Sequence, residues 1–582
     1  MPYYYTLQSE KIDYYREELY QLVSKHSGPK AIEILEEKYG NLDPKEYKKV
    51  YDAQVITSLY LINNIEQAFK AWEEKEWGKR IEFEDFCEQI LPYRIAHEPL
   101  EEWREVYYNA FQPILDSLLE EKYNPVAAFD LLYDTIVNVI WIHYEDIPIP
   151  YLGAKNLLKS RIGNCDNRTE FATYIMRALG IPGGTDFIPQ YPNRMAGGHS
   201  WNFVTDTLGK AIPYSLYEER PGQVPEIELK KGRVYRKFFG IQTNSLPFIV
   251  KNKEGIPNKL YNAFIKDVSQ EYFSPCEIQI DIYPSLPKLD RIVYLATFNN
   301  QEWVPVAWSR VDQKQAIFQY VDRGIMYLPM YYQNGKATPI SYPILVKEDG
   351  TQHFFKPNLQ EKQSLILHRK YPIQPWWNWF TYRPVGGKFQ GANNSQFKDA
   401  VTFYTITDTL DMKWHTIHTN NMDKFRYVRY LSAPKGYNNM AELQFYTDND
   451  VPLKGEVIGT SGSYYNESNA SKHAVFDNDP LTYYDAKDDS KDWAGLDMGE
   501  SYKITSIKYL FRNDDNGIRI GDRYELFYWD KNQWNSLGQK IADKNILQYE
   551  NCPTEALFLL QNYSRGLEER IFTYKNEKQV FW

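Results

Sequence analysis

The chain has 582 residues and a formal net charge of −10, and 43% of its residues are hydrophobic. We expect several domains, because a single hydrophobic core stops growing at about 250–300 residues. The acidic balance argues against a nucleic-acid partner, which needs a concentrated basic face. No run of about 18 apolar residues indicates a transmembrane helix.

The cysteines are few and lie far apart in the chain, at Cys87, Cys165, Cys276 and Cys552. Without a CxxC pair, the sequence predicts neither a zinc knot nor a dense disulfide framework. The N-terminus, MPYYYTLQSEK, lacks the basic-then-apolar pattern of a secretory signal. That is expected of a cytoplasmic protein, or of a mature chain whose leader has been removed.

Residues 1–150 are predicted to be mostly helical. In IDYYREELYQLVSKH and EYKKVYDAQVITSLYLINNIEQAFKAWEEK, apolar residues recur at three- and four-residue spacing among charged ones. This is the pattern of amphipathic helices. The segment AAFDLLYDTIVNVIWIHY (127–144) is apolar almost all round, so we expect a buried central helix there.

Strand-like segments dominate the chain beyond about residue 270. Runs such as RIVYLATF, QAIFQYV and IMYLPMYY are separated by polar turns such as NNQE and KEDG. This pattern of strand-like runs separated by turns predicts all-β units. We expect a β-sandwich at 270–355 and two further sandwiches in tandem, at 358–449 and 450–582.

The segment KSRIGNCDNRTEFATYIMRALGIP places a cysteine at the start of a predicted helix. Gly163 allows a flexible entry and Asn164 can cap the helix, so Cys165 falls in the first turn. Backbone N–H groups and the helix dipole stabilise a thiolate at that position. The same N–H groups can hold a developing oxyanion.

A nucleophilic thiol needs a base, and His199 follows in the segment GGHSWNFV. The two preceding glycines allow a backbone or a substrate to approach closely. From spacing alone, Cys165 and His199 are either a catalytic pair or a buried small residue and a structural histidine.

Two segments together resemble the core of the transglutaminase-like superfamily, whose fold is papain-like α+β. They are RIGNCDNRTEFATYIMRALGIP and GGHSWNFV. The resemblance covers about residues 155–216, inside a domain expected at 151–265. The helical region at 1–150 then belongs to this domain or packs on it. The resemblance implies that Cys165 is the nucleophile and that His199 is the general base and acid.

The third catalytic position departs from the family pattern. Members usually carry an Asp on the strand after the His, but here that strand reads GKAIPYSL, with Ser215 at the best-matching place. Asp206 in the turn before and Glu218 shortly after are the alternatives. A hydroxyl accepts the imidazole N–H but does not stabilise imidazolium as a carboxylate does. The position therefore stays open among these three.

Other polar residues are candidates for binding the substrate. In ILPYRIAHEPLEEWR (90–104), Arg94 could bind a carbonyl or carboxylate of the substrate, and Tyr93 could position that group. Alternatively, these residues form a salt-bridge cluster that links helices. The loop TDFIPQYPNRMAGG (185–198) is predicted as a wall of the cleft, although its polar groups could equally be solvated. Asp186, Gln190, Asn193 and Arg194 of this loop could face the substrate, and Trp201 is a further candidate.

The C-terminal unit reads HAVFDNDPLTYYDA, WAGLDMGESYKITSIKYLFRN and YELFYWDKNQWNSLG. These segments resemble a galactose-binding-like sandwich of the discoidin, or coagulation factor 5/8 type C, family. The segment FRYVRYLSAPKGYNNMAELQFY resembles the latter half of a second such module. The expected architecture is thus a multidomain chain: a helical and α+β part, a β-sandwich and two jelly-roll sandwiches.

The same resemblance implies one structural Ca²⁺ in the last sandwich. Hard oxygen ligands suit this ion, and the candidates are Asp477, Asp479, Thr482 and Glu569. Alternatively, the two aspartates only cap a turn. No cofactor is expected for catalysis.

The resulting hypothesis is a cysteine-dependent amide or peptide hydrolase that acts on glycoprotein, glycopeptide or cell-wall peptide, with carbohydrate as a further possible ligand. One alternative is a non-catalytic carbohydrate-binding or adhesion protein on a degenerate transglutaminase-like scaffold. A second is an amidase that cleaves the bond between glycan and asparagine. The architecture favours an extracytoplasmic location.

Overall fold

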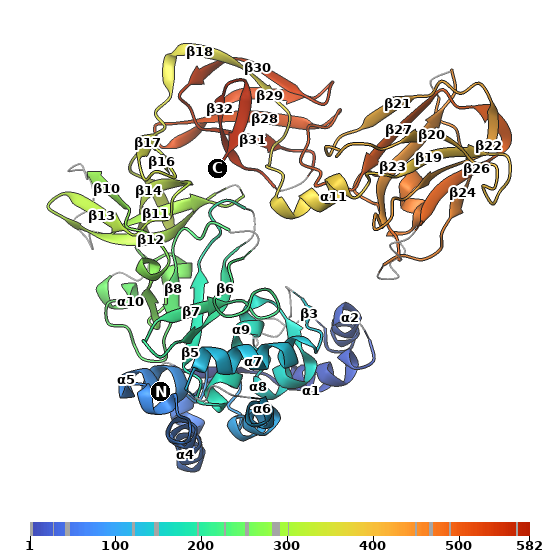
Figure 1. Ribbon diagram of the computed structural model, residues 1–582. Helices are drawn as coiled ribbons and strands as arrows, with labels where there is room; N and C mark the ends of the chain where they lie inside the picture. Colours follow the sequence, from blue (N-terminus) through green and yellow to red (C-terminus); the bar gives the residue numbers. More distant parts are fainter. Residues whose placement is uncertain are drawn as a thin grey trace. The chain divides into compact units, whose positions relative to one another are not determined.

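A computed structural model of the chain describes residues 4–26, 28–40, 47–118, 123–144, 151–194, 197–225, 229–250, 255–281, 292–300, 302–448, 451–464, 470–487, 491–565 and 568–582. The chain divides into two compact units, Met1–Lys356 and Pro357–Phe581. The first unit holds most of the helices and two larger antiparallel sheets. The second is built mainly of strands (Figure 1).

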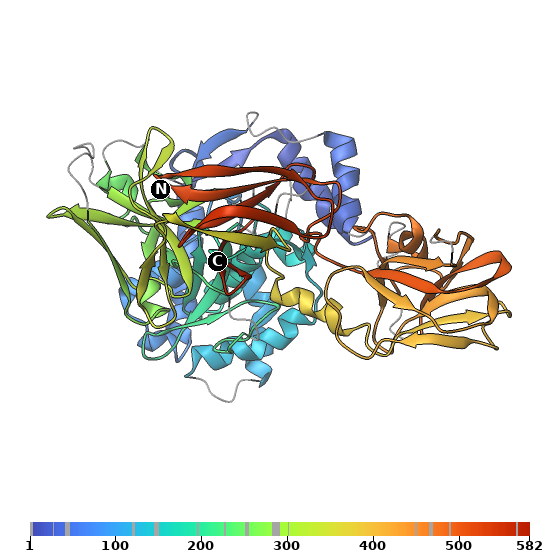
Figure 2. The ribbon, with the colours of Figure 1, turned by 90° about the horizontal axis from the view of Figure 1, so that it is seen from above.

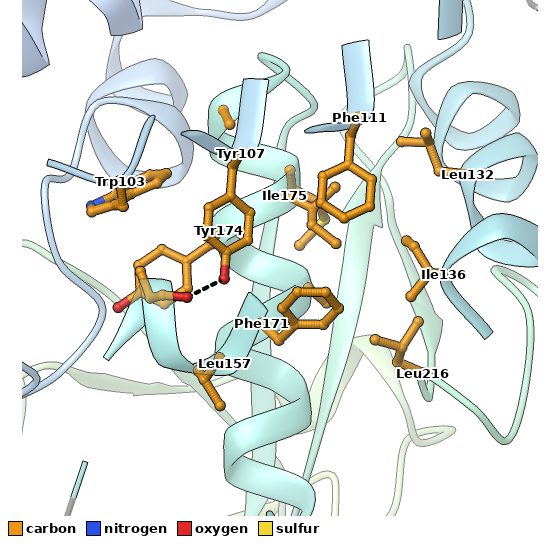
Figure 3. Close-up of a cluster of buried hydrophobic side chains, with 14 of the residues drawn as sticks. Trp103, Tyr107, Phe111, Leu132, Ile136, Leu157, Phe171, Tyr174, Ile175 and Leu216 are labelled. Atoms are coloured by element: carbon orange, nitrogen blue, oxygen red, sulfur yellow. Dashed lines mark hydrogen bonds between the residues drawn. The ribbon is translucent and has the colours of Figure 1, made fainter. Parts of the chain in front are cut away.

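Helix α9 (Cys165–Ala178) lies at the centre of the helical part, and its side chains from Thr169 to Ala178 are all buried. It packs against α6 (Arg104–Leu118), α7 (Pro125–Val137) and α8 (Ala154–Ser160). Figure 3 shows the buried side chains that meet there: Tyr107, Phe111, Leu132, Ile136, Leu157, Phe171, Tyr174 and Ile175. This core fixes α9 and therefore the position of its first turn.

The first unit also contains other helices. They are α1 (Glu10–Val23), α2 (Gly28–Tyr39), α3 (Asp52–Val55), α4 (Ser58–Glu74), α5 (Phe83–Asp85) and α10 (Leu246–Ile249). Two small sheets accompany them: β1 (Tyr5–Gln8) with β2 (Lys48–Tyr51), and β3 (Ile142–His143) with β4 (Ile162–Gly163).

The single helix expected at 127–144 is wrong in its second half, because α7 ends at Val137. The β-branched residues that follow disfavour helix, and the Ile140 side chain is exposed. The Trp141 indole donates a 2.8 Å hydrogen bond to the Gly163 carbonyl, which fixes this stretch beside β4.

A five-stranded antiparallel sheet packs beside α9, in the order β7-β6-β5-β8-β9. Its strands are β5 (Gly183–Ile188), β6 (His199–Thr205), β7 (Ala211–Tyr214), β8 (Tyr235–Lys237) and β9 (Ile265–Asp267). The Asn202 amide joins β6 to α9 by donating to the Thr169 carbonyl at 3.1 Å and to the Thr173 hydroxyl at 3.2 Å.

The region expected as a sandwich at 270–355 forms one eight-stranded antiparallel sheet by strand pairing. The main order is β10-β13-β12-β11-β14-β16-β17, with β15 paired to β14. The strands are β10 (Glu277–Asp281), β11 (Ile292–Phe298), β12 (Trp303–Asp312), β13 (Gln315–Gln319), β14 (Ile325–Gln333), β15 (Lys336–Pro339), β16 (Ile344–Val346) and β17 (Gln352–Phe354).

The second unit contains a first sandwich within residues 388–511. One sheet has the order β20-β19-β22-β26-β24 and the other β21-β27-β23-β25. The strands are β19 (Lys388–Ala392), β20 (Val401–Thr405), β21 (His415–His418), β22 (Lys424–Leu431), β23 (Asn438–Tyr446), β24 (Glu456–Gly459), β25 (Tyr484–Asp485), β26 (Trp493–Lys503) and β27 (Ser506–Phe511). Short helix α11 (Asn378–Tyr382) precedes it.

A second group of strands follows, and Figure 2 shows its strands beyond residue 520 in red. Its larger sheet has the order β29-β28-β31-β32-β33, and β18 pairs with β30. The strands are β18 (Asn358–Leu367), β28 (Arg523–Asp530), β29 (Gln533–Ile541), β30 (Leu547–Thr554), β31 (Phe558–Asn562), β32 (Ile571–Lys575) and β33 (Lys578–Phe581).

This pairing cuts across the boundary that we expected between 449 and 450. Strands β22 and β23, before the boundary, pair with β26 and β27, after it. Strand β18 pairs with β30, almost two hundred residues further along the chain. A local sequence pattern predicts strands but does not identify such distant partners.

Among the described helices, none is long and apolar enough to cross a membrane.

Candidate functional site

Helix α9 begins at Cys165, as the sequence predicted. The Asn164 side chain caps it by accepting the N–H groups of Asp166 at 3.1 Å and Asn167 at 3.4 Å. Gly163 has a φ of 139°, and a Cβ there would collide with the Asn167 side chain. The glycine and the cap thus set the half-buried Cys165 at the positive end of a fixed helix dipole.

His199 is the first residue of β6 and lines a pocket of about 320 Å³ in the first unit. Alternation along the strand places Trp201 in the same pocket, while Ser200 and Asn202 bond to α9. Ser215 and Glu218 also line this pocket. Cys165 is not part of this lining; it lies where α9 begins.

A hydrogen-bonded cluster joins the start of α9 to the start of β6. The Asp166 carboxylate accepts the Ser200 hydroxyl at 2.7 Å and the Lys237 ammonium of β8 at 3.1 Å. Asp166 follows Cys165 in sequence, and Ser200 follows His199. The cluster therefore fixes the backbone on which both proposed catalytic side chains are carried.

Several charges act on the imidazole of His199. Burial lowers its pKa, and the guanidinium groups of Arg168 and Arg194 lower it too, whereas the carboxylates of Glu218 and Asp166 oppose them. The net effect is a pKa below the ordinary value for histidine. At neutral pH the ring is therefore mainly in the basic form that can accept a proton.

Tyr191 links this environment to Cys165. Its ring is stacked on His199 at a centroid distance of 5.7 Å, and the Arg194 guanidinium lies 3.7 Å from the centre of the Tyr191 ring. Burial raises the pKa of Tyr191 to about 12, and the charge of Cys165 contributes to that rise. The cysteine and the histidine thus share one electrostatic neighbourhood.

The structure brings together Ser215 and Glu218, two of the three candidates for the third position. The chain makes a tight turn after β7, in which Tyr217 has a φ of 72° and Ser215 pairs with Glu219. The Ser215 hydroxyl then donates a 2.7 Å hydrogen bond to the Glu218 carboxylate. This turn carries Glu218 back to the end of the strand.

Glu218 also forms an ion pair with Arg168 of α9, at 2.8 Å. Burial raises the pKa of Glu218, but Arg168 and the Ser215 hydroxyl outweigh it, so the pKa lies below the ordinary value. Glu218 is therefore a carboxylate at neutral pH. It is the candidate acid beside His199, and Ser215 orients it.

Asp206 does not reach this pocket. It follows the far end of β6, where its carboxylate accepts the backbone N–H groups of Leu208 at 2.8 Å and Lys210 at 2.9 Å. It closes the turn to β7, so its proposed catalytic role is wrong.

Arg94 and Tyr93 belong to the salt-bridge cluster that was the alternative to substrate binding. Arg94 is 1% exposed and pairs with the fully buried Asp52 at 2.6 Å, and the Tyr93 hydroxyl donates to the same carboxylate at 2.8 Å. Arg94 also donates to the carbonyl of Glu98 at 2.9 Å. No part of this arrangement leaves the guanidinium open to a substrate.

Asp186 is buried too. It holds Arg236 through hydrogen bonds of 2.8 and 2.9 Å, and it accepts the Tyr272 hydroxyl at 2.8 Å. Tyr272 in turn accepts the Trp201 indole at 2.9 Å. Asp186 therefore supports Trp201, which lines the pocket, and does not itself contact a ligand.

Two loop candidates lie off the pocket lining. Gln190 is buried, donates to the Tyr191 carbonyl at 3.1 Å and accepts the Lys259 ammonium at 3.0 Å. Asn193 is half-buried. Met195 and Ala196 of the same loop lie outside the described residues. Arg194, which the sequence analysis named, lines the pocket, and so does Tyr191, which the sequence analysis missed.

The proposed calcium loop lies in the first sandwich. Asp477 accepts the Asp479 N–H and the Thr482 hydroxyl, each at 2.8 Å, and Asp479 accepts the Leu481 N–H at 3.0 Å. Glu569 belongs to the second group of strands, where it accepts the Asn562 N–H at 2.9 Å. Glu569 is therefore the wrong partner for this loop.

Glu442 of β23 is the acid that lies beside the loop. Its carboxylate is close to Asp477 and to the backbone of Asn478, but neither oxygen makes a well-formed hydrogen bond. Burial and the charges of Asp477 and Asp479 raise its pKa to about 8. A buried carboxylate without a partner is costly, and a bound cation would relieve that cost.

No group of three or more His, Cys, Asp or Glu side chains gathers as a metal site within the described ranges. Calcium sites also use hydroxyl and carbonyl oxygens. The calcium site therefore stays a prediction, with Glu442, Asp477 and Thr482 as its candidate ligands.

A family model of the F5/8 type C domain matches residues 458–557. No curated protein matches the chain. The matched residues contain β26 and β27 of the first sandwich and β28 to β30 of the second group of strands. The chain thus carries a module of the carbohydrate-binding type, a kind common in extracellular proteins. The transglutaminase-like resemblance of residues 155–216 stays a prediction.

Proposed function

We propose that the chain is a cysteine-dependent hydrolase of amide or peptide bonds. The observation that supports this most is the Asp166–Ser200 hydrogen bond, which holds the helix start that carries Cys165 against the strand start that carries His199. Fixed geometry between a thiol and a base is the first requirement of nucleophilic catalysis. The second requirement is an activated thiol, which the helix dipole and the lowered pKa of His199 supply.

In the proposed reaction, His199 takes the thiol proton and the Cys165 thiolate attacks the carbonyl carbon of the substrate amide. A C–S bond forms, and the C–N bond breaks as the imidazolium gives its proton to the leaving amine. The acyl group remains on Cys165 as a thioester. Neutral His199 then deprotonates a water molecule, whose oxygen displaces the thiolate and releases a carboxylic acid.

Glu218 has a defined part in these steps. The imidazolium exists briefly in both halves of the reaction, and a carboxylate nearby stabilises it. Glu218 lines the same pocket as His199, and its charge raises the pKa of the imidazole against the effect of burial. The Ser215 hydroxyl and Arg168 hold this carboxylate in place.

The substrate class follows from the attached module. A carbohydrate-binding type of module beside a hydrolase favours a glycoprotein, a glycopeptide or a cell-wall peptide as the target, and an extracytoplasmic location. This is an inference from architecture and not from the pocket. Product masses would separate a peptidase from an amidase that leaves aspartate in place of a glycosylated asparagine.

The test is alkylation of Cys165 by iodoacetamide as a function of pH, read by peptide mass spectrometry. In the wild type, labelling should stay fast well below pH 8, and His199→Ala should slow it. Half-buried Cys276 in the same chain is the internal reference. If Cys165 is labelled at the same rate as Cys276, and His199→Ala leaves that rate unchanged, the proposed cysteine-dependent activity is refuted.

A further inference from the structure

The second unit contains a groove of about 550 Å³, separate from the pocket of His199. Its walls come from the outer face of the sheet β21-β27-β23, from the loop at 512–520 and from the end of β18. Among the described residues that line it, five carry cations and one, Asp515, is acidic. The five are Arg369, Lys413, Lys508, Arg519 and Arg565.

Three arginines of the groove are held by carboxylates. Arg369 pairs with Asp514 and Arg519 with Asp515, while Arg565 bonds to Asp522 at 2.9 and 3.0 Å.

The side chains of Asp514 and Asp522 are each 4% exposed, so these two lie behind the groove and not in it. An arginine fixed in this way keeps further N–H donors in a set direction. Such arginines are preorganised, so they can bind a carboxylate or a sulfate with little loss of side-chain entropy.

The rest of the lining suits a sugar. Trp414 is 38% exposed at the rim, so one face of its ring can stack on a sugar ring. Neutral amide side chains, which both donate and accept, lie among the cations and can pair with hydroxyl groups. They are Gln444, Asn478, Asn513 and Asn545.

We propose that this groove binds an anionic oligosaccharide, with its carboxylate or sulfate groups on the arginines and lysines and one sugar ring on Trp414. The volume lies in the range of ligand pockets, about 300–1,000 Å³, which suits a short oligosaccharide better than an extended polyanion. Lys413 pairs with exposed Asp411 at 3.1 Å, so it too is held by a carboxylate, as the three arginines are. The proposal is independent of Cys165 and of hydrolysis.

The experiment is isothermal titration calorimetry of the full chain with three tetrasaccharides: an oligogalacturonate, a chondroitin sulfate fragment and a neutral galactan fragment. The binding variant is Lys413→Gln with Lys508→Gln, and the stacking variant is Trp414→Ala. The matched control is Lys424→Gln with Lys503→Gln, which removes the same charge from paired positions on the opposite sheet of the same sandwich.

The wild type should bind at least one acidic tetrasaccharide and not the neutral one, and the acidic group that binds distinguishes carboxylate from sulfate. The binding variant should weaken affinity about tenfold or more and Trp414→Ala about threefold or more, with the control unchanged. Three results overturn the proposal. They are no binding of either acidic fragment, equal binding of the neutral one, or equal losses in the binding variant and the control.

A short duplex DNA of the same charge, added as a competitor, tests the other class of polyanion. It should not displace the bound saccharide at equal concentration. Displacement by the duplex would replace the proposal with nucleic-acid binding.

Discussion

The Ser200 hydroxyl donates a 2.7 Å hydrogen bond to the Asp166 carboxylate, and these two residues directly follow His199 and Cys165 in sequence. Lys237 joins them at 3.1 Å. Burial lowers the pKa of Lys237, but the charges of Asp166, Glu170 and Cys165 outweigh it and raise the pKa above the ordinary value. Electrostatic effects are reciprocal, so the ammonium group stabilises the Cys165 thiolate in turn.

Lys237→Met should therefore slow alkylation of Cys165 at pH 7 about tenfold, because loss of one nearby cation raises a thiol pKa by about one unit. Lys237→Arg should restore most of the rate. Lys266→Met changes an exposed lysine on the neighbouring strand β9 and should have no effect. Equal rates for Lys237→Met and Lys266→Met would show that the cluster does not act on the thiol.

Glu218→Gln tests the third catalytic position. The substitution removes a negative charge that raises the pKa of His199, so the imidazole should titrate at a lower pH than in the wild type. Turnover should fall by on the order of 10²-fold, as is typical when acid–base assistance is lost. Carbon-13 NMR of labelled histidine, assigned with His199→Ala, gives the titration.

Ser215→Ala is the companion of Glu218→Gln. It removes the hydrogen bond that orients Glu218 but leaves the carboxylate, so its effect on titration and turnover should be the smaller one. A larger effect of Ser215→Ala than of Glu218→Gln would make Ser215 the direct partner of His199.

The sequence predicted the beginning of α9 well but left the third position open, and the physical reason is local. Gly163, Asn164 and Cys165 act over one helical turn, so their order in sequence is enough to read the cap. The approach of Glu218 depends on a tight turn with Tyr217 in a left-handed conformation. Tyrosine gives no signal for that conformation, whereas glycine or asparagine would.

The role of Arg94, which the sequence left open, and the sandwich boundary share another cause of uncertainty, which is distance along the chain. Arg94, which lies outside any helix, pairs with Asp52 of α3, and β18 pairs with β30. Polarity and strand pattern show that such residues need partners. They do not show which partners, since these depend on contacts that form only in the folded chain.

Arg94→Met tests the structural role of that cluster. It leaves the buried carboxylate of Asp52 unpaired, which should destabilise the first unit by about 3–5 kcal/mol. The double change Arg94→Met with Asp52→Asn should recover part of that loss, because no charge then remains buried. Urea unfolding measures both. A rise in KM with unchanged stability would return Arg94 to a substrate-binding role.

Glu442→Gln tests the calcium loop. Ca²⁺ at about 100 times its Kd should stabilise the wild type by about 3 kcal/mol, seen as a higher midpoint in thermal unfolding. The response should vanish in Glu442→Gln and persist in Glu569→Gln, because Glu569 bonds to Asn562 away from the loop. A wild type that does not respond to Ca²⁺, or a response lost only in Glu569→Gln, would contradict the assignment.

Glu170 gives the first unit a pH-dependent stability. Burial and the charges of Glu98 and Asp166, opposed by Lys237, raise its pKa from 4.5 to about 8. Between these two values the folded chain keeps a proton that the unfolded chain has lost, so the free energy of unfolding falls as pH rises from 4.5 to 8. Below 4.5 both states are protonated, and this contribution no longer changes.

Glu170→Gln removes the titrating group and keeps the side chain's shape. Relative to the wild type it should gain stability at pH 9, by on the order of a few kcal/mol, and gain little at pH 5. The urea midpoint of α9, read by hydrogen–deuterium exchange, measures this directly, and Glu105→Gln, an exposed glutamate of α6, is the control. An equal shift of the midpoint at both pH values would mean that Glu170 is ionised in the folded chain, with Lys237 compensating its charge.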